Sequence, residues 1–256
     1  ARPKQITPKG DWNVWLILAG RGWGKTRTGA QDIAFYGLTR PNSRIAIVAP
    51  THRDGRDTCI EGISGLLSCF DRELIENWNR SIGELTLKNG TIYRTFSAEQ
   101  PDRLRGPQFH RAWCDELGAW KNDEAWDQLL FGLRLGENPQ IVVTTTPKPT
   151  DIIKELVSSK DSLVTRGSTF ENKDNLAESA VKKLKEKYEG TRLGRQELFA
   201  EILEDVEGAL WNRNMISKAL IKSTDIIPNF TRTVVAIDPA VTSKKNSDET
   251  GIVVCA

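Results

Sequence analysis

The stretch 16–30, LILAGRGWGKTRTGA, constrains the fold more than any other part of this chain. It passes from an apolar run through a cluster of glycines into an amphipathic pattern. The apolar run predicts a buried strand that ends at Ala19, and the small and apolar residues of 30–37 recur at helical spacing. The glycines therefore lie at a strand-to-helix turn, where unpaired backbone N–H groups can bind an anion.

Residues 19–26, AGRGWGKT, fit the phosphate-loop pattern at every fixed position except the first, where Ala19 replaces glycine. Lys25 would place its charge on the β and γ phosphates of a nucleotide, and Thr26 would offer its hydroxyl to Mg²⁺. The other residues that we assign to the nucleotide site are Gly20, Arg21, Gly22, Trp23 and Gly24. An ordinary glycine-rich turn with an exposed lysine is the alternative, which the strand-to-helix context disfavours.

Length and composition set broad limits. The 256 residues allow one large domain with a remnant, or two small domains. With 36 basic and 34 acidic residues the net charge is only +2, so any contact with nucleic acid must come from a local basic surface. Four cysteines without CxxC spacing are interpreted as small core residues, and no zinc site is expected. No apolar run has membrane-spanning length or resembles a signal peptide, which indicates a soluble intracellular protein.

Alternating strands and helices predict an α/β fold with a mostly parallel sheet flanked by helices. Strands are expected at 16–19, 43–51, 139–146 and 161–170, and helices at 26–37, 56–70, 123–136 and 150–160. Within the helix at 56–70, Cys59, Ile63, Leu66 and Phe70 would share one face. The segment 83–98 predicts a hairpin that turns at Asn89 and Gly90, because this pair accepts positive φ. Thr150 is expected to cap the helix that follows it.

The composition changes after residue 174, which we take as the end of a phosphate-loop core at 1–174. Residues 175–205 predict two charged helices broken near Gly190, suited to a small helical lid. Residues 206–232 are interpreted as a linker. Residues 233–256 begin a new pattern of two apolar strands joined by a polar loop.

The acidic pair Asp115 and Glu116 ends the apolar stretch RAWCDE. Hydrolysis of a nucleotide needs a carboxylate for Mg²⁺ and a group that orients the attacking water. We assign the first role to Asp115 and the second to Glu116. Helix caps for the segment after them are the alternative, but their place one crossover after the phosphate loop favours the catalytic interpretation. An adjacent glutamate also favours ATP-driven machines over GTP switches.

Two arginines are candidates for stabilising the transition state. Arg21 lies inside the loop, and its guanidinium could point toward the phosphates or pack outward over the helix. Arg105 lies in a loop expected to be exposed. Inserted into a neighbouring subunit's site, it could raise the rate by about 10³ to 10⁵. Arg103 is the competing candidate, and a merely solvated arginine is the alternative.

The run Thr144, Thr145 and Thr146 ends the strand expected at 139–146. Hydroxyls at the carboxyl edge of a sheet can hydrogen-bond a γ-phosphate or the catalytic glutamate, and so report the state of the nucleotide. Ordinary β-branched strand residues are the alternative.

Taken together, these motifs resemble one family, the large terminase subunits of tailed bacteriophages, which are ATP-driven DNA packaging motors. The resembling stretches follow the family's order over nearly the whole chain: RPKQITPKGDW, LAGRGWGKTRTGA, PDRLRGPQFHRAWCDE, VVTTTP, GTRLGRQELFAEIL and VVAIDPA. The resemblance implies a RecA-like ATPase core of the additional-strand type with a lid subdomain. It also implies a following nuclease domain of the ribonuclease-H kind.

The resemblance also implies roles for single residues. Gln5 would belong to an adenine-reading segment, Arg21 would be the catalytic loop arginine, and Arg105 would act in trans within a pentameric ring. The three threonines from Thr144 would form the coupling motif. The implied cofactors are ATP and Mg²⁺.

For the second domain, the resemblance matches Asp238 in AIDPA to the first metal-binding carboxylate of the family's nuclease, which would use Mg²⁺ or Mn²⁺. A strand-end turn before a proline is the alternative. The remaining acidic motifs are absent from these residues, so we do not expect this fragment to cut DNA. Asp248 is interpreted as a solvated loop residue.

The partners that the resemblance implies are double-stranded DNA, the portal protein, the small terminase subunit and further copies of the chain on the procapsid, with no membrane. The site of action would be the cytoplasm of an infected bacterial host, and the protein would be absent from the mature virion. A RecA-like helicase or translocase is the first alternative, and the AIDPA strand after a linker favours the packaging enzyme over it. A non-catalytic nucleotide switch is the second, and Glu116 beside Asp115 argues against it.

Overall fold

The computed structural model describes residues 1–188, 191–202, 215, 232–239 and 251–255. The chain divides into two compact units, Ala1–Glu204 and Asp205–Ala256. Asp248 lies outside the described residues, and so does the predicted linker except for residues 215 and 232. The predicted boundaries at 174, 205 and 232 therefore stay predictions.

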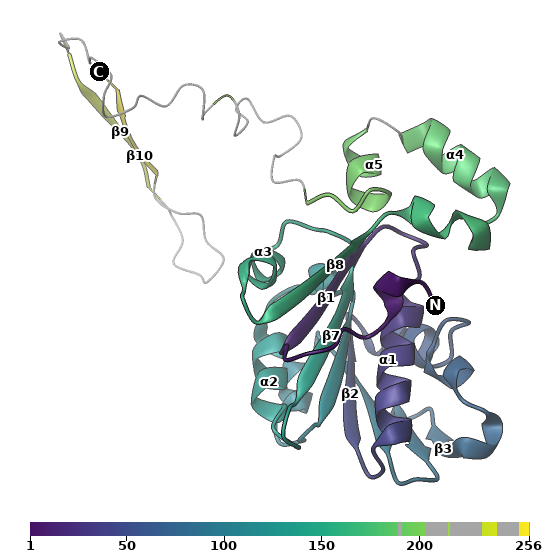
Figure 1. Cartoon of the computed structure of the whole chain (residues 1–256). Helices are drawn as coiled ribbons and strands as arrows, with labels where there is room; N and C mark the ends of the chain where they lie inside the picture. Colours follow the sequence, from purple (N-terminus) through teal and green to yellow (C-terminus); the bar gives the residue numbers. More distant parts are fainter. Residues whose placement is uncertain (189–190, 203–214, 216–231, 240–250, 256) are drawn as a thin grey trace. The chain divides into compact units, whose positions relative to one another are not determined.

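The first unit is built on an eight-stranded sheet with the order β3-β4-β5-β2-β6-β7-β1-β8 (Figure 1). The strands are β1 Val14–Ala19, β2 Arg44–Ala49, β3 Ile75–Asn79, β4 Glu84–Leu87, β5 Ile92–Ser97, β6 Arg111–Asp115, β7 Gln140–Thr145 and β8 Ser162–Gly167. Neighbours from β5 to β8 pair in parallel, whereas β3 and β4 extend the sheet antiparallel. This arrangement confirms the predicted α/β fold class with a mostly parallel sheet.

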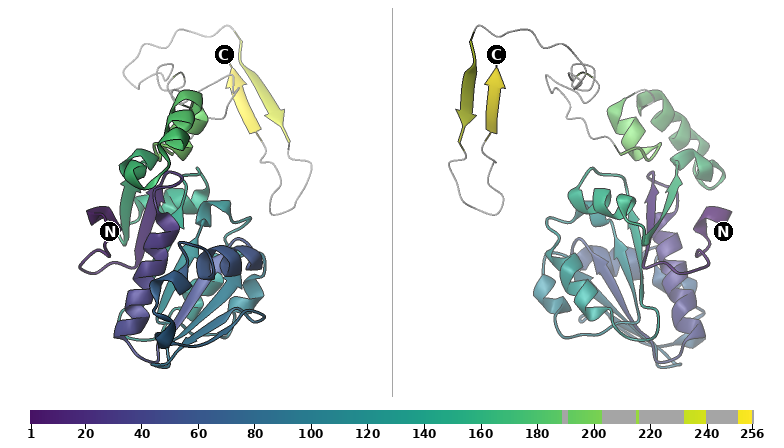
Figure 2. Two further views of the ribbon diagram at one scale, coloured as in Figure 1. Left: turned by 90° about the vertical axis from the view of Figure 1, so that its right-hand side faces the viewer. Right: turned by 60° about the vertical axis from the view of Figure 1, so that its left-hand side comes forward.

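Strand β1 is buried on both faces, which explains its uninterrupted apolar sequence. Trp15 and Ile17 belong to the core under α1, Lys25–Thr39, while Leu16 and Leu18 belong to the core on the opposite face. Helices α2, Glu124–Gly132, and α3, Asp151–Ser158, cover that second face (Figures 1 and 2). The helical face predicted at 30–37 is confirmed, since Ala30, Ile33, Ala34 and Gly37 are buried.

The predicted helix at 56–70 is wrong. The chain forms a short π-helical turn at Asp54–Ile60 and a 3-10 turn at Leu66–Cys69. Ile63, expected to share one helical face with Cys59, is 97% exposed, whereas Cys59 is buried. Gly65 approaches the preceding turn so closely that a Cβ there would lie 2.7 Å from the carbonyl oxygen of Ile60. Gly65 therefore permits a compact turn, which the spacing of the apolar residues does not indicate.

Two local expectations are confirmed in outline but not in detail. The hairpin between β4 and β5 forms, yet only Gly90 of the expected pair takes a positive φ, of +82°. The side chain of Asn89 instead donates to the carbonyl oxygen of Gly37 at 2.9 Å. Thr150 occupies the N-cap position of α3, but its hydroxyl makes no capping hydrogen bond and is buried without a partner.

The interpretation of the cysteines as core residues is correct for Cys59 and Cys114, which are buried. It is wrong for Cys255, which is exposed, and only partly correct for Cys69. Within the described ranges, none of the helices combines the length and apolar character needed to cross a membrane.

After β8, a 3-10 segment at Thr169–Asn175 leads into α4, Glu178–Tyr188, and α5, Arg192–Glu197. This confirms two charged helices on either side of a break near Gly190. In the second unit, β9, Val234–Asp238, and β10, Gly251–Cys255, pair antiparallel with Asp238 opposite Gly251. The two strands predicted there are confirmed, and their assignment to a nuclease domain stays a prediction.

A buried ion pair joins α1 to the sheet. Arg111 on β6 donates to both carboxylate oxygens of Asp32 on α1, at 2.7 and 2.8 Å, and the two side chains are only 4% and 2% exposed. Thr7 donates to the same carboxylate at 2.6 Å, and the Arg111 guanidinium stacks on Trp12 and Tyr36. The network ties the N-terminal segment, α1 and the sheet together.

We expect Arg111→Met to lower the free energy of unfolding by about 3–5 kcal/mol, because it leaves the Asp32 carboxylate buried without its cation. Urea denaturation measures this loss. Arg94→Met is the control, since its half-exposed pair with Glu84 should contribute about 0–1 kcal/mol. The double variant Asp32→Leu/Arg111→Met should recover most of the stability. A double variant no more stable than Arg111→Met would contradict this view of the pair.

Candidate functional site

The three predicted motifs meet at one edge of the sheet because of the strand order. The phosphate loop follows β1, the acidic pair ends β6, and β7 with its threonines lies between these two strands. The register places Asp115 beside Thr144 and Leu18 beside Thr145. Since carboxyl ends of parallel strands share an edge, this is where an α/β sheet binds its ligands.

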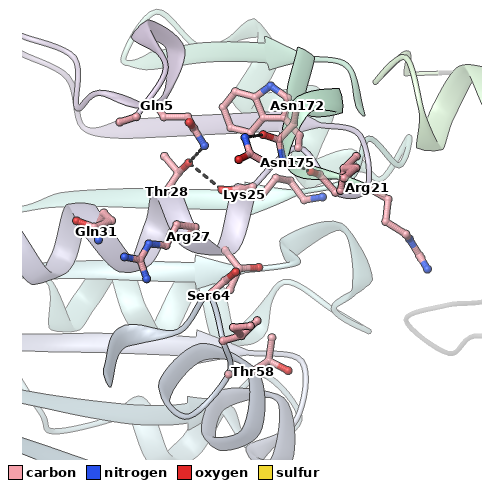
Figure 3. Close-up of a pocket in the computed structure, with 18 of the residues that line it drawn as sticks. Gln5, Arg21, Lys25, Arg27, Thr28, Gln31, Thr58, Ser64, Asn172 and Asn175 are labelled. Atoms are coloured by element: carbon pink, nitrogen blue, oxygen red, sulfur yellow. Dashed lines mark hydrogen bonds between the residues drawn. The ribbon is translucent and has the colours of Figure 1, made fainter. Parts of the chain in front are cut away.

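A cavity of about 970 Å³ opens at this edge (Figure 3). It is lined by Ala1, Gln5, Arg21, Gly22, Trp23, Gly24, Lys25, Thr26, Arg27, Thr28, Gln31, Asp57, Thr58, Gly62, Ile63, Ser64, Glu116, Asn172, Asn175 and Leu176. The phosphate loop and Glu116 therefore face one shared space, whereas Asp115 and the three threonines from Thr144 are not among the described residues that line it.

The loop backbone has the form of an anion site. Gly22 and Gly24 adopt φ values of +78° and +100°, which side chains other than glycine rarely tolerate. Within the described residues, neither of their amides donates a hydrogen bond. The first amides of α1, at Lys25 and Thr26, have no partner within the helix because they lie in its first turn. Four N–H groups are thus available to a phosphate.

Lys25 is one of three basic side chains among the described residues that line the cavity, with Arg21 and Arg27, and it is the buried one of the three. Its Nζ lies 3.6 Å from Oε1 of Glu116 and donates to the carbonyl oxygen of Gly20 at 3.4 Å. The short distance joins the phosphate loop to the acidic pair directly. A buried ammonium group needs such partners, and phosphate oxygens could supply them instead.

Glu116 adopts a φ of +48°, an uncommon value for a residue with a side chain. Its Oε2 accepts hydrogen bonds from the backbone N–H and the hydroxyl of Thr146, at 3.2 and 3.3 Å. Strained backbone of this kind clusters at functional sites. The carboxylate is thereby held between the last threonine of the run and Lys25.

Asp115 is buried, and both of its oxygens are held. Thr144 donates to Oδ1 at 2.6 Å, and the Cys59 thiol lies 3.6 Å from Oδ2. The indole of Trp113 donates to the Thr144 hydroxyl at 2.7 Å, and because an indole can only donate, the hydroxyl proton is directed to Asp115. Burial, followed by the charge of Glu116, raises the pKa of Asp115 to about 6, although Thr144 and Lys25 oppose the rise.

The carboxylate of Asp115 is the candidate ligand for a magnesium ion at this site. A buried carboxylate whose charged form is disfavoured would be stabilised by a cation, and Mg²⁺ prefers oxygen ligands. Thr26 lines the cavity that the loop shares with Glu116. No group of three or more His, Cys, Asp or Glu residues gathers within the described ranges. A metal here would therefore depend on substrate phosphates and water for most of its ligands, which is usual for Mg²⁺.

The remaining assigned residues differ in how they relate to the cavity. Gln5 lines it and donates to the Thr28 hydroxyl at 3.1 Å. Trp23 is buried, and its indole donates to Glu171 at 3.2 Å. The side chain of Arg21 is 83% exposed, extends away from the cavity in Figure 3, and lies 3.6 Å from the carboxylate of Glu197.

Arg105 is not among the described residues that line the cavity. It is exposed and lies 3.2 Å from the carboxylate of Asp102. Asp238 is an exposed residue at the end of β9 in the second unit. The roles predicted for Arg21, Arg105 and Asp238 stay predictions.

Sequence reasoning missed the side of the cavity formed by Thr58, Ile63, Asn172 and Asn175. The two asparagines come from a polar segment about 150 residues after the loop, as the spacing of the Asn172–Gly22 contact shows. Neither asparagine belongs to a motif, so only the folded chain reveals them.

Solved structures share this fold. The ATPase domain of the large terminase of Thermus phage P74-26 aligns with a TM-score of 0.58 at 17% identity, over 76% of this chain and 90% of that domain. The large terminase of a thermophilic bacteriophage, solved in complex with ADP, aligns with a TM-score of 0.63 at 13% identity, over 75% of this chain and 48% of that protein. The HK97 bacteriophage large terminase aligns with a TM-score of 0.58 at 18% identity, over 76% and 47%.

The chain thus spans nearly all of the isolated ATPase domain but about half of the two longer large terminases. Among curated proteins, none matches it. Residues 16–218 match the family described as "Terminase large subunit, T4likevirus-type, N-terminal". Because this match covers most of the sequence, the chain belongs to the terminase large subunit family, over the N-terminal region of T4likevirus type.

Proposed function

We propose that this chain is the ATP-hydrolysing part of a viral DNA packaging motor. The observation that carries the proposal is the 3.6 Å distance between Lys25 and Glu116, at a cavity lined by both the loop and the acidic residue. Membership in the terminase family supports it. The large terminase of the thermophilic bacteriophage, which has the same fold, is described in complexes with ADP and with ATP-gamma-S.

In the proposed reaction, the loop amides and Lys25 hold the phosphates of ATP. Thr26 and Asp115 are the residues that would hold Mg²⁺, which supplies charge neutralisation for the phosphates when bound. Glu116 orients the attacking water and accepts its proton. Phosphate oxygens would compete with Glu116 for Lys25, leaving the glutamate oriented by Thr146 and free to face the water.

The wider assembly is part of the proposal. The chain would act on double-stranded DNA in a pentameric ring, docked on the portal protein of the procapsid with the small terminase subunit, in the cytoplasm of an infected bacterium. DNA would be gripped through its phosphates rather than read by sequence. Asp238 would belong to a nuclease domain of a longer protein, with Mg²⁺ or Mn²⁺ as its metal. A helicase or other translocase is the alternative, because the same ATPase site would serve it.

We expect Glu116→Gln to bind ADP within about twofold of the wild type and to lose turnover by at least about 100-fold, since the amide keeps the shape but cannot accept a proton. Calorimetry measures binding, and phosphate release measures turnover. Glu99→Gln, which removes a surface carboxylate paired with Lys121, is the control and should change neither. Turnover near the wild-type rate in Glu116→Gln would reject the base. A wild type that binds ADP but releases no phosphate would favour a non-catalytic switch.

For Arg105, mixing two variants separates action in trans from action in cis. Arg105→Ala and Glu116→Gln should each be inactive alone, because the first lacks the arginine and the second lacks the base. In mixed rings, a site with an intact Glu116 can receive Arg105 from its neighbour, so phosphate release should reappear. Arg103→Ala is the control and should hydrolyse ATP unmixed. A mixture as inactive as its two components would contradict action of Arg105 in trans. Dilute monomer that hydrolyses ATP as fast as the assembled protein would also contradict it, because an arginine supplied by a neighbour should raise the rate by about 10³-fold or more.

A further inference from the structure

Three consecutive carbonyl groups of the phosphate loop accept hydrogen bonds from side chains outside it. The hydroxyl of Thr169 donates to the carbonyl oxygen of Arg21 at 2.7 Å. The side-chain amide of Asn172 donates to that of Gly22 at 2.7 Å. The guanidinium of Arg2 donates to that of Trp23 and stacks on its indole. We call Arg2, Thr169 and Asn172 the carbonyl clasp.

The clasp determines where the loop amides point. A trans peptide is planar, so its C=O and the N–H of the next residue point in opposite directions. Because Thr169 holds the carbonyl group of Arg21, the N–H of Gly22 must point away from Thr169. Because Arg2 holds the carbonyl group of Trp23, the N–H of Gly24 must point away from Arg2. Between residues 20 and 24, these are the two amides that donate to no acceptor within the described residues. The middle peptide is fixed on both sides, since the N–H of Trp23 donates to the carbonyl oxygen of Gly20 at 3.2 Å.

An external hold is needed because the loop is rich in glycine. Gly22 and Gly24 take positive φ here, and without a Cβ they reach other conformations at little cost. A flipped peptide would present a carbonyl oxygen to an anion instead of an N–H. Hydrogen bonds that select one orientation in advance lower the cost of binding, which is the advantage of preorganisation.

The clasp residues are themselves held. Thr169 is buried, and Asn175 donates to the side-chain oxygen of Asn172 at 2.9 Å. Because that oxygen already accepts a hydrogen bond, the NH₂ group of Asn172 is the end directed to Gly22. Thr169 and Asn172 both lie in the 3-10 segment that leads into α4 and α5. The clasp therefore links the loop to the segment ahead of the helices predicted to form a lid.

We propose that Thr169 and Arg2 are positioning residues that hold the amides of Gly22 and Gly24 toward the phosphate groups of a bound nucleotide, and that Asn172 is a positioning residue that fixes the peptide between them. The inference rests on the proposed function, because the ligand is the nucleotide of that site. None of the three touches the reacting atoms, so they set affinity rather than the chemical step. By linkage, a bound nucleotide must stabilise the clasp as much as the clasp stabilises the bound nucleotide.

The test is calorimetry with ADP in the presence of EDTA, which removes metal from the measurement. We expect Thr169→Val and Asn172→Ala each to raise the Kd by about three- to tenfold, the range that corresponds to losing one hydrogen bond. Thr169→Ser keeps the hydroxyl and should restore the wild-type Kd. In hydrolysis, KM for ATP should rise while kcat at saturating ATP stays within about twofold. Hydrogen exchange should show that ADP protects residues 169–175 in the wild type.

The chain offers matched controls at the other end of α1. Asn89 and Thr91 both donate to the carbonyl oxygen of Gly37, at 2.9 and 3.0 Å. Asn89→Ala and Thr91→Val therefore remove the same kinds of hydrogen bond far from the loop, and the Kd for ADP should not change. Melting temperatures of all variants show whether each is folded.

Two binding results would overturn the inference but not the proposed function: wild-type Kd values for Thr169→Val and Asn172→Ala, or controls that weaken binding as much as the clasp variants do. A wild-type chain that binds neither ADP nor ATP would overturn the proposed function, and the clasp with it. A fall in kcat with KM unchanged would assign these residues to the chemical step and would also contradict the inference.

Discussion

The parallel pairing of β1, β7 and β6 is the constraint on which the candidate site depends. It brings the carboxyl ends of the three strands to one edge, so that a loop near residue 20, an acidic pair near 115 and a threonine run near 145 become neighbours. As a result of this pairing, Lys25 of the loop and Glu116 of the acidic pair lie 3.6 Å apart. With another strand order, the same three motifs would lie apart and could not serve one ligand.

Burial makes these contacts matter. Lys25 and Asp115 are both nearly inaccessible to solvent, so their polar groups need partners within the protein or the ligand. Among the described residues, Asp115 has hydroxyl and thiol donors but no paired cation, whereas Lys25 contacts both the carbonyl oxygen of Gly20 and the carboxylate of Glu116. Within the described residues, the site thus combines the carboxylate of Asp115, which has no paired cation, with the amine of Lys25, whose partner Glu116 can be replaced by a phosphate. In the proposed function, Mg²⁺ would pair with Asp115 and a phosphate oxygen would pair with Lys25.

Whether a feature could be predicted from the sequence depends on how far apart in the chain its interacting residues lie. The helix after the glycine-rich turn and the buried strands depend on residues close together in the chain, and the structure confirms these elements. The prediction of a helix at 56–70 is wrong because the chain turns there, with Gly65 packed against Ile60. The spacing of the apolar residues does not indicate this contact. Thr169 and Asn172 reach the loop across about 150 residues, as their separations from Arg21 and Gly22 show, so no local pattern could have found them.

The most direct test of the shared site is a structure of the chain with Mg²⁺ and a non-hydrolysable ATP analogue. We expect the phosphates to accept hydrogen bonds from the amides of Gly22 and Gly24, with Lys25 turned from Glu116 to a phosphate oxygen. Asp115 should lie on the metal side of the same nucleotide. Phosphates bound elsewhere, or a Lys25–Glu116 pair left unchanged beside a bound nucleotide, would contradict the central claim.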